Sequence, residues 1–322
     1  MRAVQIVELT GPDTALRLVD LPSPQPGEDQ VLIDVHAAGV AFPEVLQTRG
    51  MYQLKPPVPF VPGSEVAGVV VSAPPSAQVG VGDRVAAMCL LGGFAEQAVA
   101  PSYLVFPLPD ELDFAQGAGL ILNYHTAWFS LVTRGRLQAG ETVLVHGAAG
   151  GVGTATLQVA KGLGARTIAV VSTDDKEKVA RDAGADEVLR ADGPWKDQAK
   201  ELGGADIVID PVGGDRFTDS LRSLRPQGRL VVVGFTGGEI PTVRVNRLLL
   251  NNIDVVGAAW GEFSIRRPDV MAATHAEVSR LITAGFVRPP IGARFPLEAA
   301  ADAVRLLDQR GATGKVVLDV RK

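Results

Sequence analysis

The segment VLVHGAAGGVGTATLQVAK, residues 143–161, constrains the fold more than any other part of the chain. It opens with an apolar run typical of a buried parallel strand, and helical apolar spacing begins at Thr154. Between them stand Gly147, Gly150 and Gly153. Glycine lets the backbone turn sharply and approach a pyrophosphate, and the N-terminus of the following helix attracts that anion. Strand, turn and helix together predict a dinucleotide-binding turn.

Composition limits the number of domains and the kinds of partner. A chain of 322 residues is long for one hydrophobic core, and 46% hydrophobic residues can fill two. The net charge of −5 attracts neither nucleic acid nor an anionic membrane surface, so we expect small-molecule partners. The chain has no apolar run of about 18 residues, no signal-peptide pattern and one cysteine, Cys89. These features predict a soluble, cytoplasmic protein.

Three regions of the chain differ in composition and hydrophobic pattern. Residues 1 to about 120 hold short β-branched runs between Pro- and Gly-rich turns, which predicts an irregular all-β domain. From about 125 to 260, predicted strands alternate with helices, and the helix after the second strand is capped by Ser172 or Thr173. This alternation predicts an α/β fold with a doubly wound parallel sheet that binds its ligand at the carboxyl ends of the strands. The last stretch holds a helix ending at glycine and a final strand over residues 315–320.

Several motifs carry a family resemblance over nearly the whole chain. The glycine turn, PFVPGSEVAGVV over residues 59–70 and the tail GATGKVVL resemble the medium-chain dehydrogenase/reductase superfamily. NYHTAW, IDPVGGDRF and VVVGFTGGEIP follow in the expected order, and the set is most similar to the zinc-free NADPH:quinone oxidoreductases related to zeta-crystallin. This resemblance implies a discontinuous GroES-like catalytic domain over residues 1–122 and 264–322. It also implies a Rossmann domain over residues 123–263, with the active site in the cleft between the two.

The sequence argues against a zinc site. Zinc-dependent relatives use a cysteine and a histidine at positions that hold Ala41 and Ser64 here, and neither side chain ligates zinc. One cysteine cannot form a four-cysteine structural site, and the four histidines lack ligand spacing. We therefore predict no bound metal. The resemblance places His125 near the nicotinamide, and an ordinary structural histidine is the alternative.

The end of the second Rossmann strand predicts NADPH as the cofactor. Ser172 stands where NAD-selective domains place an acidic residue for the ribose hydroxyl. Lys176 follows one turn later, where a cation would bind the 2′-phosphate, although a solvated lysine in the DDKEK run is the alternative. Some relatives add a tyrosine after the third strand; Ala191 stands there, and we take its neighbour Arg190 as the substitute. By family position, the candidate cofactor residues are Thr126, Ala149, Gly150, Gly151, Val152, Ser172, Lys176, Arg190, Gly234, Phe235 and Gly257.

The sequence offers no acid–base constellation, and hydride transfer does not need one. The cofactor supplies the reducing equivalent, while the protein holds the nicotinamide against an acceptor. Cys89 resembles a buried small hydrophobe. The cleft candidates, each of which is equally consistent with packing, are Tyr52, Phe94, Asn123, Tyr124, Trp260 and Phe263. Ala41 also stands where relatives often carry an asparagine near the nicotinamide.

The resemblance favours an NADPH-dependent, zinc-independent quinone reductase. One alternative is an NADPH-dependent enoyl reductase, which needs a proton donor such as Tyr52 or Tyr124 and would accept an enone. Another is a non-enzymatic NADPH-binding, crystallin-like protein. The apolar segment over residues 243–257 lies beside the last Rossmann strand at an open sheet edge, and family members join such edges, so we predict a homodimer.

Overall fold

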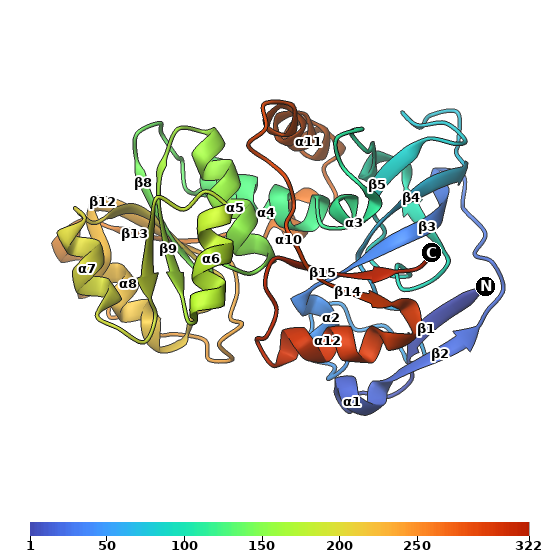
Figure 1. Cartoon of the computed structure of the whole chain (residues 1–322), viewed down its shortest axis with the longest axis horizontal. Helices are drawn as coiled ribbons and strands as arrows, with labels where there is room; N and C mark the ends of the chain where they lie inside the picture. The colour runs from blue at the N-terminus through green and yellow to red at the C-terminus, as the bar shows by residue number, and fades with distance from the viewer. Residues whose placement is uncertain (322) are drawn as a thin grey trace. The chain divides into compact units, whose positions relative to one another are not determined.

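The computed structural model describes residues 1–321, which divide into two compact units (Figure 1). Unit 1 comprises Met1–Leu122, Pro268–His275 and the residues from Pro289 onward, and unit 2 comprises Asn123–Arg267 and Ala276–Arg288. The domain boundaries given above stay predictions; in the structure, residues 276–288 pack with unit 2. No helix among residues 1–321 is long and apolar enough to cross a membrane.

Unit 2 is built on a parallel sheet of six strands in the order β10-β9-β8-β11-β12-β13. The strands are β8 (Thr142–His146), β9 (Arg166–Val171), β10 (Glu187–Arg190), β11 (Ala205–Asp210), β12 (Leu224–Val232) and β13 (Asp254–Gly257). The first strand lies in the middle, and the chain winds outward from it in both directions. The predicted doubly wound α/β fold is therefore confirmed. The point where the strand order reverses, between β8 and β11, is where such sheets bind ligands.

Helices cover both faces of this sheet. Figure 1 shows α5 (Gly151–Gly162) and α6 (Asp174–Asp182) over one face, and α7 (Trp195–Glu201) and α8 (Phe217–Ser223) over the other. Under the second pair, Leu144, Ile168 and Val208 pack against Trp195 and Phe217. Burial on both faces explains why these strands are continuously apolar. The other helical segments of unit 2 are α4 (Thr126–Trp128), η3 (Phe129–Arg134), η4 (Gly214–Arg216), α9 (Asn246–Asn251) and α10 (Trp260–Ser264). Two more, η2 (Ile121–His125) and α11 (Pro268–Thr283), contain residues of both units.

Unit 1 is the predicted irregular all-β domain. Its main sheet has seven strands in the order β14-β15-β3-β4-β5-β7, with β6 also paired to β3, and β1 and β2 form a separate pair. Its strands are β1 (Arg2–Ile6), β2 (Leu16–Asp20), β3 (Gln30–Val40), β4 (Glu65–Ser72), β5 (Arg84–Met88), β6 (Gln97–Pro101), β7 (Val105–Pro107), β14 (Ile291–Pro296) and β15 (Lys315–Asp319). Its helical segments are α1 (Pro12–Ala15), α2 (Phe42–Gln47), η1 (Ser102–Leu104), α3 (Phe114–Gly117), η5 (Leu297–Ala299) and α12 (Ala300–Asp308). In β3, Val31, Ile33 and Val35 are fully buried and alternate with partly exposed residues, which is the pattern of a strand with one core face, whereas residues 37–40 are all buried.

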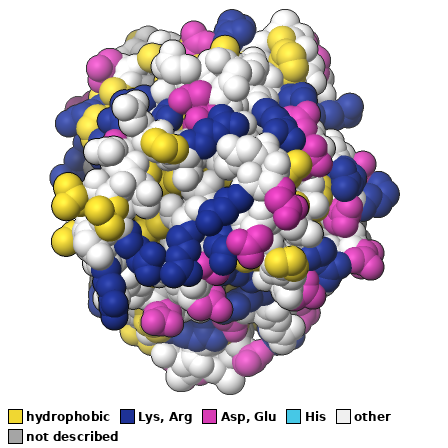
Figure 2. All heavy atoms as spheres, turned by 90° about the vertical axis from the view of Figure 1, so that its left-hand side faces the viewer, with side chains coloured by type: hydrophobic (Ala, Val, Ile, Leu, Met, Phe, Trp, Pro, Cys, Tyr) yellow, Lys and Arg dark blue, Asp and Glu magenta, His cyan; other side chains and the backbone are white. Residues whose placement is uncertain are grey.

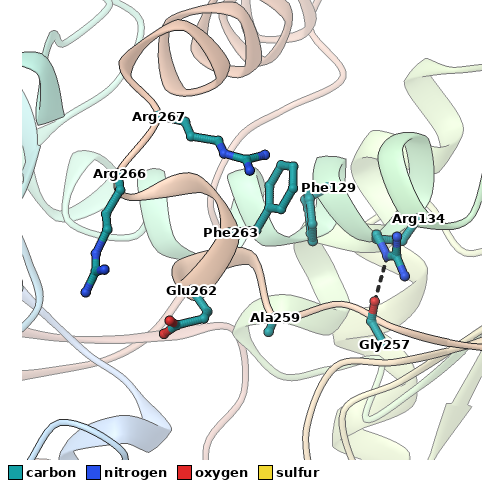
Figure 3. A pocket seen from close by; sticks show the side chains of 8 residues that line it. All are labelled: Phe129, Arg134, Gly257, Ala259, Glu262, Phe263, Arg266 and Arg267. Atoms are coloured by element: carbon teal, nitrogen blue, oxygen red, sulfur yellow. Dashed lines mark hydrogen bonds between the residues drawn. The ribbon is translucent and has the colours of Figure 1, made fainter.

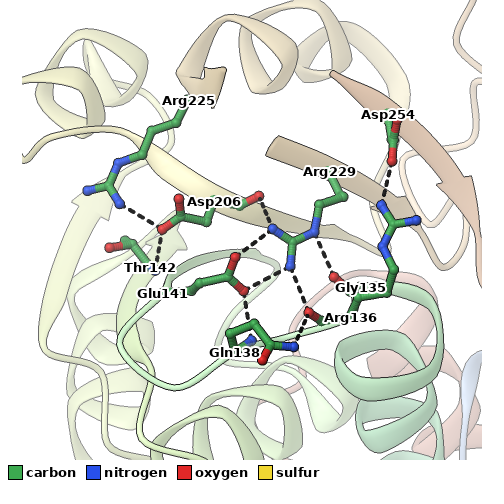
Figure 4. Close-up of polar contacts among 9 residues, drawn as sticks. All are labelled: Gly135, Arg136, Gln138, Glu141, Thr142, Asp206, Arg225, Arg229 and Asp254. Carbon is green, nitrogen blue, oxygen red and sulfur yellow. Dashed lines mark hydrogen bonds and ion pairs between the residues drawn. The ribbon is translucent and has the colours of Figure 1, made fainter. Parts of the chain in front are cut away.

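An arginine network fastens the amino-terminal side of the unit 2 sheet. Arg229 of β12 donates two 2.8 Å hydrogen bonds to the carboxylate of Glu141, which precedes β8 (Figure 4). It also donates to the carbonyl oxygens of Gly135, at 2.7 Å, and Arg136, at 3.1 Å. Next to it, Arg225 pairs with Asp206 at the start of β11. These bonds join the segment before β8 to strands that come much later in the sequence.

Acidic and basic side chains are interspersed over the outer face of unit 2. Figure 2 shows Lys and Arg side chains lying close to Asp and Glu, with hydrophobic side chains between them. The ion pairs of unit 2 include Arg222 with Asp219 on α8 and Lys178 with Asp182 on α6. Because these side chains are 39–77% exposed, each such pair contributes little to stability.

Candidate nucleotide-binding site

The glycine turn after β8 has a backbone conformation and a close packing that residues with a Cβ could not adopt without strain. Gly147 has φ of +57°, in the left-handed region, and the amide of Gly150 donates to its carbonyl oxygen at 3.0 Å. A Cβ on Gly153 would lie 2.2 Å from the same oxygen, so α5 approaches the turn more closely than a side chain allows. The N-cap residue is Gly150, and no side chain caps the helix. The first-turn N–H groups of this twelve-residue helix are thus available to an anion.

Three predicted phosphate-binding residues lie together at the end of β9. Lys176 Nζ is 3.4 Å from Ser172 Oγ, and Arg190 Nη2 donates to the carbonyl oxygen of Ser172 at 2.9 Å. Thr173 caps α6 by accepting the amide of Lys176, which leaves the Ser172 hydroxyl outside the cap. Of the two predicted caps, Thr173 is therefore the one in the structure. Arg190 also pairs with Asp174, whose side chain is 93% exposed.

The other cofactor candidates of unit 2 follow the carboxyl edge of the sheet. Gly150 and its neighbours come after β8, Gly234 and Phe235 come after β12, and Gly257 ends β13. The Gly257 carbonyl accepts a 2.7 Å hydrogen bond from Arg134 Nε (Figure 3). Thr126 begins α4 and is largely buried. These roles remain proposals, but the candidates other than Thr126 follow or end strands at the edge where doubly wound sheets bind ligands.

Asp210 shapes the carboxyl edge of the sheet, and the sequence reasoning did not select it. It ends β11, is 1% exposed, and its Oδ1 accepts the amides of Val212 at 2.8 Å and Gly213 at 2.9 Å. The buried carboxylate fixes the loop at the carboxyl edge, beside the point where the strand order reverses. The available signal was the sequence IDPVGG, in which an aspartate ends an apolar strand and a turn follows.

Asn123 and Tyr124 contact α5, the helix that follows the glycine turn. A Cβ on Gly151 would lie 2.6 Å from Asn123 Nδ2, so the amide packs directly against the start of α5. Tyr124 is 1% exposed and donates its hydroxyl to Gln158 Oε1 at 2.7 Å. Burial raises the pKa of this phenol well above its ordinary value. The placement favours a packing role for Tyr124 over the predicted role as a cleft residue or proton donor.

The remaining cleft candidates are divided between the two units. Tyr52 and Phe94 belong to unit 1, and Phe94 is completely buried in its core. Trp260 and Phe263 belong to unit 2, where Trp260 is 3% exposed and lies edge-on to His125 with ring centroids 5.8 Å apart. Phe263 is 39% exposed. Phe94 is thus a core residue, whereas Phe263 presents its ring to solvent.

Ala41 and Ser64, which stand at the positions of the zinc ligands, both hydrogen-bond to the buried carboxylate of Glu44. Glu44 accepts the Ser64 hydroxyl at 2.8 Å and the Ala41 amide at 2.8 Å. Burial raises the pKa of Glu44 above its ordinary value, and the Ser64 hydrogen bond opposes this shift. Nearby, Lys315 forms a buried ion pair with Glu65. Among residues 1–321, no three His, Cys, Asp or Glu side chains are grouped to hold a metal ion.

The buried thiol of Cys89 faces two carbonyl oxygens of the same region. Its Sγ lies 3.5 Å from the Gly63 oxygen and 3.4 Å from the Ser64 oxygen. Burial raises its pKa, which disfavours the reactive thiolate. The prediction that Cys89 is a buried residue is confirmed.

Comparison with known proteins places this geometry in a family. Residues 27–110 match the alcohol dehydrogenase GroES-like domain, and residues 151–276 match the zinc-binding dehydrogenase family. Quinone oxidoreductase-like protein 2 of Rattus norvegicus is 39% identical, over 99% of this chain and 92% of the relative. The structure of a probable oxidoreductase from Mycobacterium abscessus is 42% identical, with a TM-score of 0.91 and coverage of 99% of both chains.

A second solved structure is the quinone oxidoreductase from Thermus thermophilus, which was also determined in complex with NADPH. It is 34% identical, with a TM-score of 0.84, and the match covers 99% of this chain and 100% of that one. Similarity of this extent covers both units and the glycine turn. The chain therefore belongs to the quinone oxidoreductase family of the medium-chain dehydrogenase/reductase superfamily, and it is an enzyme of that family.

Proposed function

We propose that the protein is an NADPH-dependent, zinc-independent oxidoreductase that transfers a hydride to a quinone-type acceptor. The observation that carries the cofactor choice is the convergence of Ser172, Lys176 and Arg190 at the end of β9. A hydroxyl and two cations match the needs of a 2′-phosphate, whereas NAD-selective domains place a carboxylate at this point. The NADPH complex of the Thermus relative supports the proposal.

The residues of unit 2 could hold the cofactor at two points. The first-turn amides of α5 and the glycine turn would bind the pyrophosphate, and Lys176 and Arg190 would bind the 2′-phosphate. NADPH, when bound, supplies the hydride. A quinone accepts its protons from solvent, so the reaction requires no protein acid. The engagement of the Tyr124 hydroxyl with Gln158 fits this requirement and disfavours Tyr124 as the donor in enoyl reduction.

Steady-state oxidation of NADPH against quinones, enals, enones and enoyl thioesters tests the proposal. We expect turnover with quinones and a higher kcat/KM for NADPH than for NADH. Preferential turnover of enones or enoyl thioesters would replace quinone chemistry by enoyl reduction. Binding of NADPH with no turnover of any acceptor would favour the non-enzymatic alternative.

A further inference from the structure

Arg190, one of the two cations proposed for the 2′-phosphate, already has acidic partners. Asp174 is the first residue of α6, directly after the N-cap Thr173, and its carboxylate forms an ion pair with Arg190 Nη1. Through Nη2, the same guanidinium donates to the carbonyl oxygen of Ser172 at 2.9 Å and to the carboxylate of Asp192 at 3.4 Å. Two carboxylates therefore contact Arg190 at the point where the proposed function places a phosphate.

These contacts use the part of Arg190 that would bind a phosphate. Its Nε is buried and has no hydrogen-bond partner among residues 1–321, so its hydrogen bonds run through the two terminal nitrogens. Those nitrogens belong to the planar fork with which arginine binds phosphate groups. The Arg190 side chain is 37% exposed, and that of Asp174 is 93% exposed. A phosphate that arrives from solvent thus meets a nitrogen that the Asp174 carboxylate already contacts.

The start of α6 keeps the Asp174 carboxylate at this place. Thr173 accepts the amide of Lys176 at 3.3 Å, which fixes the backbone on either side of Asp174. The positive end of the helix dipole also favours a carboxylate in the first turn. The Ser172 hydroxyl, which precedes the cap, lies 3.4 Å from Lys176 Nζ. A negative charge is therefore built into the chain beside the cations proposed for the phosphate.

We propose that Asp174 sets the strength of the preference for NADPH by competing with the 2′-phosphate for Arg190. The phosphate must displace the carboxylate or bind next to a like charge, and either event costs binding free energy. NADH carries a hydroxyl in place of this phosphate and leaves the pair of Asp174 with Arg190 intact. Asp174 thus weakens the binding of NADPH and not that of NADH. The effect rests on the proposed function, which supplies the position of the 2′-phosphate.

Titration calorimetry of the full chain with NADPH and with NADH, without an acceptor, tests the role of Asp174. Asp174→Asn removes the charge at nearly constant size. We expect its Kd for NADPH to fall at least about threefold, which is within the range of exposed ion pairs, and its Kd for NADH to change by less than about twofold. The titrations are made at about 0.15 M salt, where charges that are not in contact are largely screened.

Asp175→Asn is the matched control, because it makes the same charge change at the next residue of α6, which is also exposed. Within residues 1–321, Arg190 pairs with Asp174 and Asp192 and not with Asp175. The control should therefore change each Kd by less than about twofold. A second control uses the Arg190→Gln background, in which carboxylate and phosphate share no guanidinium. Adding Asp174→Asn there should also change the Kd for NADPH by less than about twofold.

Three results would overturn the role of Asp174. An unchanged Kd for NADPH in Asp174→Asn would mean that the carboxylate does not compete. A higher Kd would mean that Asp174 orients Arg190 for the phosphate. An equal gain in affinity in Asp175→Asn, or in the Arg190→Gln background, would mean general repulsion between like charges.

Other results would refute the proposed function. A wild type that binds NADPH no more tightly than NADH, or a preference that survives Lys176→Glu, refutes the proposed phosphate site and the competition with it. A preference that is lost in Lys176→Glu and unchanged in Asp174→Asn refutes the role of Asp174 alone. Absence of quinone turnover refutes the proposed reaction and leaves the binding result standing, because no acceptor is present in the titrations.

Discussion

The proposed phosphate site at the end of β9 contains a cation, Arg190, whose carboxylate partners are exposed. Arg190 pairs with Asp174, which is 93% exposed, and with Asp192, which is 70% exposed. Exposed ion pairs of this kind contribute about 0–1 kcal/mol. A doubly charged phosphate that meets Arg190, Lys176 and the Ser172 hydroxyl together forms stronger, charge-assisted hydrogen bonds. The observed pairs therefore do not prevent phosphate binding.

Reversing the charge at Lys176 should remove the cofactor preference. In Lys176→Glu, we expect kcat/KM for NADPH to fall about tenfold or more, while the value for NADH changes by less than about twofold, because only NADPH carries the 2′-phosphate. Lys178→Glu makes the same charge change on α6, at a lysine that is 77% exposed and pairs with Asp182. An NADPH/NADH ratio that stays the same in Lys176→Glu, or falls equally in both variants, would make Lys176 an ordinary surface charge.

The hydroxyl of Tyr124 should matter little for turnover. Because it is buried and donates to Gln158, Tyr124→Phe should change kcat on a quinone by less than about tenfold. We expect the same for Tyr52→Phe. Stopped-flow and steady-state rates with quinone and enone acceptors measure this. A loss of about a hundredfold in either variant, together with turnover of enones and not quinones, would instead identify a proton donor for enoyl reduction.

Site residues at strand ends could be predicted from the local sequence, whereas contacts between distant parts of the chain could not. Ser172, Lys176 and Arg190 could be selected because each stands at or near a strand end whose position is visible in the sequence. The hydrogen bonds of Gln158 to Tyr124 and to the backbone of Arg288 join residues 34 and 130 positions apart. No local pattern encodes such a pairing. The packing role of Tyr124 therefore emerged only from the structure.

At the scale of elements, boundaries were less predictable than the elements themselves. The helix after the glycine turn was expected from Thr154, but α5 begins at Gly151. The sequence pattern missed this first turn because its glycines carry no apolar periodicity. Similarly, β12 begins at Leu224 although its first residues, LRPQG, lack the apolar run that marks a buried parallel strand. The π-helical segments η2 and η3 have no distinct sequence signature. The alternation of strands and helices was enough to predict a doubly wound parallel sheet, which is the kind of sheet observed.

The Arg229–Glu141 pair should make the stability of unit 2 depend on pH. Burial raises the pKa of Glu141, but the hydrogen bonds from Arg229 and the Gln138 amide outweigh it and lower the pKa overall. A carboxylate with a depressed folded pKa stabilises the fold above its unfolded pKa, and this contribution is lost as the pH falls through the folded value. Acidification below about pH 4 should therefore remove it.

Removing the charge of Glu141 tests this linkage. Glu141→Gln should lower the free energy of unfolding by about 1–3 kcal/mol at pH 7, because Arg229 loses its carboxylate partner. The difference from the wild type should shrink as the pH approaches 3. Urea denaturation across this range measures it, with Glu177→Gln, at an exposed helix pair, as a control expected to stay within about 0.5 kcal/mol. A difference independent of pH would contradict the linkage.

At the scale of the whole molecule, we expect activity without zinc. Glu44 accepts hydrogen bonds from Ser64 and from the Ala41 amide, which satisfies this buried carboxylate without a metal. Purified protein should contain no stoichiometric zinc, and incubation with a chelator should leave turnover unchanged. Elemental analysis and the quinone assay measure these two quantities. One tightly bound zinc per chain, or loss of activity that zinc restores, would contradict the prediction.

The edge of the unit 2 sheet is the feature that bears on assembly. β13 is the last strand in the sheet order, so one side of its backbone has no neighbouring strand among the described residues. In the segment before it, Val245, Leu249 and Leu250 are 71–75% exposed. An unpaired edge beside exposed apolar side chains favours association with a second strand edge. Two copies of the chain can satisfy each other's edges about a two-fold axis, and we therefore propose a homodimer.

Light scattering decides the oligomeric state. The wild type should have twice the 33.7 kDa mass of one chain at micromolar concentration. A double variant, Leu249→Asp with Leu250→Asp, should yield the monomer mass, because two buried charges oppose association at an apolar interface. Val81→Asp introduces a charge at another exposed apolar residue, in unit 1, and should leave the dimer intact. NADPH affinity that persists in the double variant shows that unit 2 is folded, so a monomer mass then reflects the lost interface. A wild-type mass of 33.7 kDa would mean that the edge of β13 is tolerated without a partner.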